Sequence, residues 1–288
     1  MTIAEALERF LTQLRADGRS RHTLGQYERH VRLLWVRDVR HTGAVEAMTH
    51  EDIARFLSAP QARTSAHGGA KWATSVNALR SSLKGFFSYL HRAGYIAQDP
   101  ARLIRRAACG TTPPRALTED ERRRLLDTVA AADGPEARRD HALFQLMLGA
   151  GLRLSSALAL DIEDLDLDAG VVTVRRAKGN RPDRVFLPGE LRDHLRAYLA
   201  GRTAGPLFPT VDDRRPSLRH VQRRVARWLE RAGIRRASAH SLRHAFAQDL
   251  YRRTGDLLLV KETLRHRSIT STVVYARAED ERVRAALR

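Results

Sequence analysis

Six residues in the C-terminal half of the sequence could together break and remake a phosphodiester bond without a metal ion. Such a reaction requires a nucleophile, cations near the non-bridging phosphate oxygens, and an acid that protonates the departing 5′ oxygen. Tyrosine can be the nucleophile, arginine and histidine can stabilise negative charge, and lysine can donate the proton. The candidates for these roles are Arg153, Lys178, His240, Arg243, His266 and Tyr275.

Arg153 and Lys178 stand in segments that favour contact with an anion. Arg153 interrupts an apolar run directly after the glycines of GAGLRLS. A buried arginine there must bind an anion, because burying its charge without a partner is costly. Lys178 lies in a polar turn, AKGNRP, from which a flexible side chain can reach into a groove. The simpler alternatives are an Arg153 that extends into water and a Lys178 that is an ordinary solvated turn residue.

The segment HSLRH places His240 and Arg243 three residues apart, which puts both side chains on one face of a predicted helix. This spacing is weak evidence by itself, because the sequence contains a second such pair, His220 and Arg223. We interpret that second pair as coincidental.

His266 lies in LRHRS, and Tyr275 follows nine residues later in VVYA. A tyrosine after two valines is usually a packing residue, so Tyr275 is a candidate nucleophile only in the context of the other residues. The order of the segments therefore carries more weight than any one of them.

Helical spacing dominates the N-terminal part. Apolar residues recur with a helical period in residues 3–16, 24–35 and 73–93, and Ser20 can cap the second of these helices. Thr49 precedes a short turn with an acidic start, Glu51 to Leu57. The stretch AACGTTPPRAL then contains a glycine and two adjacent prolines, which cannot continue a helix. We predict a helical domain over residues 1–107, a linker over 108–116 and a second domain over 117–288.

The second domain is predicted to be helical with a small sheet. Thr118 caps a helix with an acidic first turn. An alternating pattern from Val171 to Leu187, with a polar turn in the middle, predicts a β-hairpin. Four further segments have helical patterns: 189–200, 217–232, 239–253 and 257–265. The fold class is therefore mainly α with a small β-sheet, an α+β fold.

The composition favours a nucleic-acid partner. The chain has 51 lysines and arginines against 33 acidic residues, a net charge of +18, and its only lysines are at positions 71, 84, 178 and 261. Arginine matches phosphate oxygens with two parallel hydrogen bonds, so an arginine-rich chain points to nucleic acid before a membrane. A coding sequence rich in GC would also favour arginine without any functional demand.

The same sequence argues against other classes of protein. The acidic start MTIAEALERF does not resemble a secretory signal, and the most apolar segment is interrupted by polar residues, so we expect a cytoplasmic protein without a membrane span. Cys109 is the single cysteine, which excludes an internal disulfide and a cysteine metal cluster. We expect no cofactor and no metal.

The six candidate residues resemble, in order and spacing, the active-site set of the tyrosine recombinase family. The N-terminal segments SRHTLGQY and ALRSSLKGFFSYLHRAGYIAQDP are similar to the core-binding domain of Xer-type and phage-type integrases. The resemblance implies a helical core-binding domain and a catalytic domain that form a clamp around double-stranded DNA. It also implies strand exchange through a 3′-phosphotyrosyl link to Tyr275, with Lys178 protonating the leaving oxygen and His240 managing the tyrosine proton.

The resemblance further implies a homo- or hetero-tetramer on paired DNA sites. The last residues, ARAEDERVRAALR, form a helix-like tail from about residue 277 that is too short to fold alone. We expect this tail to dock on a neighbouring protomer; the alternative is a tail packed on its own domain.

Two positions depart from the family pattern. Ser156 stands where the family has an acidic residue, and Arg265 stands where a glycine precedes the histidine equivalent to His266. They support an alternative: a catalytically silent DNA-binding protein that keeps the recombinase fold. A third interpretation, a metal site of His240, His244 and His266, has neither cysteine nor carboxylate ligands to support it.

Overall fold

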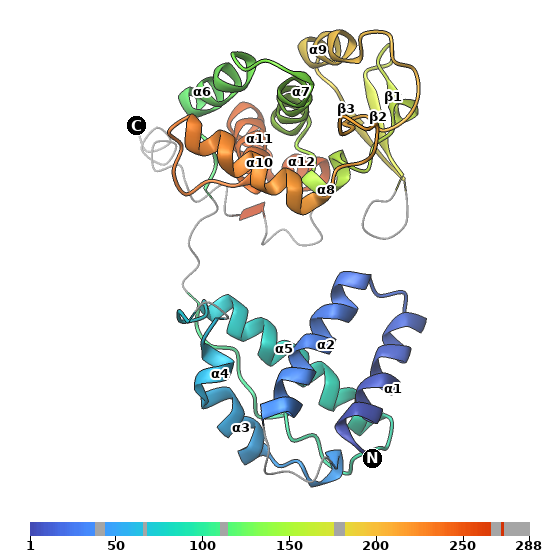
Figure 1. Ribbon diagram of the computed structural model, residues 1–288, viewed down its shortest axis with the longest axis vertical. Helices are drawn as coiled ribbons and strands as arrows, with labels where there is room; N and C mark the ends of the chain where they lie inside the picture. Colours follow the sequence, from blue (N-terminus) through green and yellow to red (C-terminus); the bar gives the residue numbers. More distant parts are fainter. Residues whose placement is uncertain (38–43, 66–67, 110–114, 176–181, 266–271, 274–288) are drawn as a thin grey trace. The chain divides into compact units, whose positions relative to one another are not determined.

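The computed structural model describes residues 1–37, 44–65, 68–109, 115–175, 182–265 and 272–273, and it divides into two compact units, Met1–Thr111 and Thr112–Arg288 (Figure 1). The helices of the first unit are α1 (Ile3–Ala16), α2 (Arg21–Arg37), α3 (His50–Ser58), α4 (Pro60–Arg63) and α5 (Ala73–Arg92). Those of the second unit are α6 (Glu119–Ala130), α7 (Pro135–Ala150), α8 (Leu154–Ala157), α9 (Gly189–Leu199), α10 (Leu218–Arg231), α11 (Ala239–Thr254) and α12 (Leu257–Thr263).

The first unit is a bundle in which α1 and α2 pack against the long helix α5. Phe10 of α1 contacts the ring of Tyr27 edge-on, with 5.0 Å between ring centroids, and it also packs against Phe86 of α5. As the sequence predicts, α2 begins after Ser20, whose hydroxyl accepts a hydrogen bond from the Thr23 amide. The short turn expected after Thr49 is a full helix, α3, with a capping box formed by Thr49 and Asp52.

Helix α7 is the centre of the second unit. It packs against α6, α9 and α11, which surround it in Figure 1, and it is buried on most of its surface, as expected of a helix enclosed by others. Thr118 caps α6 through a capping box with Glu121, as predicted. Together the helices and the sheet confirm a mainly α fold with a small β component.

The sheet has three antiparallel strands in the order β1 (Leu165–Asp166), β2 (Val171–Val174) and β3 (Asp183–Phe186). Strands β2 and β3 form the predicted hairpin, with Val174 opposite Asp183 at the end nearest the turn. The two-residue strand β1 was not predicted, because it is too short to show an alternating pattern. No helix in the described part of the chain is both long and apolar enough to cross a membrane.

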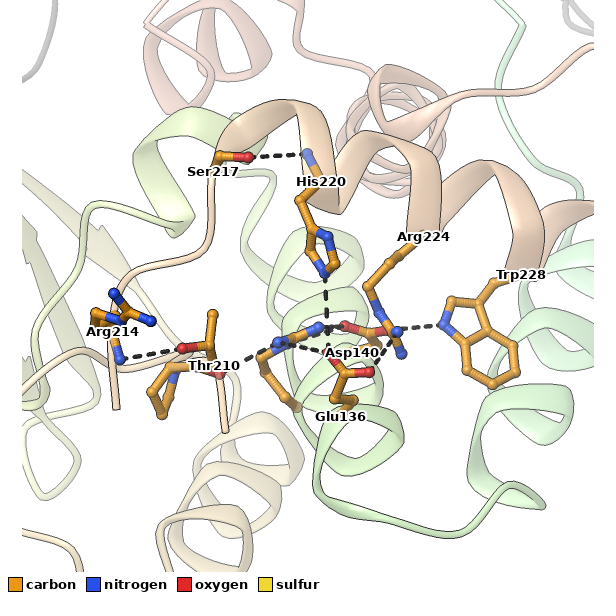
Figure 2. A network of polar contacts seen from close by, with 10 residues as sticks. Glu136, Asp140, Thr210, Arg214, Ser217, His220, Arg224 and Trp228 are labelled. Carbon is orange, nitrogen blue, oxygen red and sulfur yellow. Dashed lines mark hydrogen bonds and ion pairs between the residues drawn. The ribbon is translucent and has the colours of Figure 1, made fainter. Parts of the chain in front are cut away.

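A buried aspartate joins α10 to α7 (Figure 2). The Asp140 carboxylate is fully buried and accepts hydrogen bonds from Nε of Arg224 at 2.6 Å and from Nε1 of Trp228 at 2.8 Å. Its other oxygen accepts from Arg139, whose side chain is also buried. Glu136 adds a second ion pair to Arg224 at 2.8 Å. The network pairs every buried charge, which is the condition for such charges to be tolerated.

Replacing Asp140 with alanine should lower the free energy of unfolding by roughly 3–5 kcal/mol, because the buried cation of Arg139 and the largely buried cation of Arg224 lose their shared acceptor. Urea unfolding followed by circular dichroism measures the loss. Asp212→Ala is the matched control, since its ion pair with Arg214 is exposed and should contribute only about 0–1 kcal/mol. Equal losses in the two variants would contradict the role of Asp140.

Candidate active site

A cavity of about 320 Å³ lies in the second unit between the C-terminal end of α7, the β2–β3 hairpin, α11 and the end of α12. The two arginines singled out in the sequence, Arg153 and Arg243, both line it. Ser156, Asp183 and Arg265 are also part of its wall. The fold therefore brings two cations from separate segments to one hollow.

Arg243, on the first turns of α11, is held rigidly in the wall of this cavity. Its side chain is buried, and its Nη1 and Nη2 groups donate hydrogen bonds to the carbonyl oxygens of Gly151 and Leu264. Gly151 and Leu264 are the C-terminal caps of α7 and α12, where a helix carries partial negative charge. Two helix ends thus compensate the buried guanidinium and fix its plane.

Gly151 is required here for two reasons. Its φ of 64° lies in the left-handed region that favours glycine, and a Cβ atom at this position would lie only 2.3 Å from Cδ1 of Phe246. The glycine turn before Arg153 therefore lets α11 approach the end of α7 closely enough for Arg243 to reach the Gly151 carbonyl.

Arg153 is the N-cap of α8 and is half-buried. Within the described residues it makes no hydrogen bond or ion pair, in contrast to Arg243. A half-buried guanidinium without a protein partner at the wall of a cavity is suited to bind an anion. This arrangement supports the anion-binding interpretation of Arg153 over the interpretation as a side chain that extends into water.

His240 stands on α11 one turn before Arg243, and its ring contacts that of His244 edge-on, with 4.4 Å between centroids. Although part of the side chain is exposed, partial burial lowers the pKa of His240 below the ordinary value of 6.5. The positive charges of Arg243 and then Arg153 lower it further. The ring is therefore neutral at pH 7 and able to accept a proton.

Three predicted site residues, Lys178, His266 and Tyr275, lie outside the described residues. Asp183, the first residue of β3, follows Lys178 by five positions in the sequence, and Arg265 immediately precedes His266. Both of these neighbours line the cavity. The tail from about residue 277 is also outside the described part of the chain.

The pair His220 and Arg223 belongs to α10, and neither residue lines the cavity. His220 instead lies 3.9 Å from the Glu136 carboxylate in the network of Figure 2. Among the described residues, no three histidine, cysteine or acidic side chains are grouped as metal ligands. The carbonyls that hold Arg243 were not predicted, because backbone acceptors leave no residue-type signal.

Comparison with known proteins identifies the family. Residues 115–282 match the phage integrase family, and residues 7–94 match the phage integrase N-terminal SAM-like domain. The tyrosine recombinase XerA of Thermococcus kodakarensis is 30% identical over 98% of this chain and 94% of its own length. The tyrosine recombinase XerC of Azotobacter vinelandii is 35% identical over 97% of this chain and 93% of its own.

Solved structures show the same fold. The XerH site-specific recombinase bound to palindromic difH substrate superposes with a TM-score of 0.77 at 22% identity, covering 98% of this chain and 83% of the other. A lambda integrase dimer bound to a core site gives a TM-score of 0.73 at 19% identity, covering 94% and 97% of the two chains. The chain belongs to the phage integrase family, and it is a tyrosine recombinase, an enzyme of site-specific DNA recombination.

The His240 imidazole should titrate below pH 6.5, because burial and two arginines disfavour its protonated form. The unfolded chain binds this proton more readily, so the same shift lowers stability as the pH falls through 6.5. Histidine NMR, with the signal assigned through His240→Gln, measures the midpoint. Arg153→Gln should raise it, and Arg214→Gln, which removes a charge that does not act on this ring, should not. A wild-type midpoint at or above 6.5 would contradict the shift.

Proposed function

We propose that this recombinase cuts DNA with Tyr275. The phenolic oxygen forms a bond to the scissile phosphorus, the bond to the 5′ oxygen breaks, and a 3′-phosphotyrosyl link results. Arg153, Arg243 and His266 stabilise the negative charge on the non-bridging oxygens as the reaction proceeds. No metal takes part in this step.

Two proton transfers complete the step. His240 accepts the phenolic proton, for which its neutral ring at pH 7 is suited, and Lys178 donates a proton to the departing 5′ oxygen. The covalent link conserves the energy of the phosphodiester bond. A 5′ hydroxyl from another duplex can therefore reverse the step and join new strands without ATP.

One observation carries the proposal: Arg153 and Arg243 line a single cavity, with Arg243 fixed by two carbonyls and Arg153 without a protein partner in the described residues. No described residue accepts a hydrogen bond from the Arg153 guanidinium, so a phosphate can accept from its N–H groups. The guanidinium of Arg243, in the same cavity, is already oriented by the two carbonyls. The net charge of +18 provides the long-range attraction to double-stranded DNA.

A nicked duplex that carries the cognate site traps the covalent intermediate, because the short cleaved fragment diffuses away. We expect wild type to shift the labelled strand on denaturing electrophoresis and Tyr275→Phe to bind the duplex without any shift. Tyr198→Phe is the matched control: it loses one hydrogen bond to the Leu207 carbonyl, outside the cavity, and should still form the link. Arg153→Gln should slow capture roughly 10²–10³-fold.

Duplex binding without capture by wild type would favour the alternative, a catalytically silent DNA-binding protein. Capture by Tyr275→Phe would assign the nucleophile to another residue.

We further propose that four protomers assemble on two paired sites, since exchange between two duplexes requires four strand cuts. The tail of one copy, residues 276–288, docks on the next.

A groove of about 530 Å³ beside the cavity supports the docking of the tail. Phe186 and Leu259, which line it, are 75% and 40% exposed, although large apolar side chains are usually covered. Val283, Ala286 and Leu287 of the tail supply a short apolar face to cover them.

Deleting residues 279–288 should weaken cooperative assembly on DNA more than binding to a single site. Leu259→Asp should have the same effect, and combining the two changes should add little, because both remove one contact. Val211→Asp is the control, since Val211 is 71% exposed and does not line the groove. Gel-shift titrations on one and two sites measure both quantities. Equal loss of single-site binding and assembly would indicate a tail that packs on its own domain.

A further inference from the structure

An ion pair closes the cavity wall between the hairpin and the end of α12. Nη2 of Arg265 lies 2.6 Å from Oδ1 of Asp183, and both residues line the cavity together with Arg153 and Arg243. The Asp183 side chain is 13% exposed and that of Arg265 is 57% exposed. A short pair with a largely buried carboxylate is ordered more strongly than an ordinary surface pair.

Arg265 has a backbone conformation that favours glycine. Its φ is 51°, in the left-handed region, at the first position after the Leu264 cap of α12. Glycine is favoured at this position of a helix terminus, and a residue with a Cβ atom is strained there. Such strain persists only where surrounding contacts hold it, and the ion pair to Asp183 is such a contact.

The pair joins the two segments that lead to residues proposed to act on the phosphate. Asp183 faces Val174 at the end of the hairpin next to the turn segment, which contains Lys178. Arg265 directly precedes His266, and its neighbour Leu264 accepts the hydrogen bond from Arg243. The hairpin, the end of α12 and the buried guanidinium are thereby linked in one chain of contacts.

The ion pair also determines the net charge of the cavity wall. Among the described residues that line the cavity, Asp183 is the acidic one. An uncompensated carboxylate there would repel a phosphate bound by Arg153 and Arg243. Arg265 neutralises it and leaves the positive charge of the two other arginines intact.

We propose that Asp183 and Arg265 are positioning residues: they hold β3 against the end of α12 beside the cavity, and the chain runs from these two elements to Lys178 and His266, the residues proposed to act on the phosphate. This inference rests on the proposed function. Neither residue needs to touch the DNA, and each acts through the segment that it fixes.

The test compares Arg265→Gly and Asp183→Asn in the full chain, with three readouts: thermal midpoint, duplex affinity and the single-turnover rate of covalent capture at saturating protein. Arg265→Gly relieves the backbone strain at 265 but leaves the Asp183 carboxylate unpaired, so the two effects offset each other and the thermal midpoint should change little. Capture should slow roughly 10- to 100-fold in each variant, because positioning is lost. The double variant should be no slower than the slower single variant.

Affinity separates positioning from direct contact. Asp183→Asn removes a negative charge beside the DNA, so its affinity should be unchanged or higher while capture falls. Arg265→Lys, which keeps a cation for Asp183, should recover part of the rate. Arg236→Gly is the backbone control: Arg236 also has a positive φ, of 56°, but does not line the cavity, and its replacement should leave capture intact.

Wild-type capture with wild-type rates in both variants would overturn the positioning role alone. Loss of affinity in Arg265→Gly together with a normal rate in Asp183→Asn would also overturn it, and would assign Arg265 to a phosphate contact. A wild type without capture would overturn the proposed function and this inference with it.

Discussion

The buried guanidinium of Arg243 is the constraint on which the site depends. A cation so deeply buried is tolerated only where acceptors surround it, and here the acceptors are the carbonyls that end α7 and α12. The arginine therefore fixes three helices relative to one another. Because Gly151 has no side chain, Phe246 of α11 can pack against the end of α7, and the two contacts support each other.

In the proposed reaction, Arg153 and Arg243 have different parts in binding the phosphate. Arg243 donates hydrogen bonds to two backbone carbonyls, which fix the plane of its guanidinium. Within the described structure, the N–H donors of Arg153 are available to a ligand. A site in which both arginines were free would order them only when DNA binds and would lose conformational entropy at that moment. A site in which both were saturated would bind no phosphate. The same two charges disfavour protonation of His240, so in the proposed reaction they act both on the phosphate and on the residue that accepts the phenolic proton.

The sequence predicts well what local signals determine. Thr118 begins α6, Ser20 precedes α2, and the alternation from Val171 to Leu187 becomes the β2–β3 hairpin. Contacts between distant segments leave no such signal. Asp140 accepts from Trp228, which is 88 positions away, and nothing in either residue's neighbourhood indicates it. For the site, the sequence predicted the two arginines that share the cavity, whereas Lys178, His266 and Tyr275 stay predictions.

The two departures from the family pattern, Ser156 and Arg265, lie on the wall of one cavity, where their electrical effects can be compared. Ser156 is neutral and half-buried, so the wall lacks the negative charge that an acidic residue at this position would bring. Arg265 adds a cation, but Asp183 matches it at 2.6 Å, and the pair contributes almost no net charge to the interior of the cavity. The positive potential of the cavity is then set by Arg153 and Arg243, without an acidic residue at 156 and without an uncompensated Asp183 to reduce it. On electrostatic grounds the departures therefore give no reason for the enzyme to be silent, and their physical effect lies in how firmly the hairpin and α12 are held together.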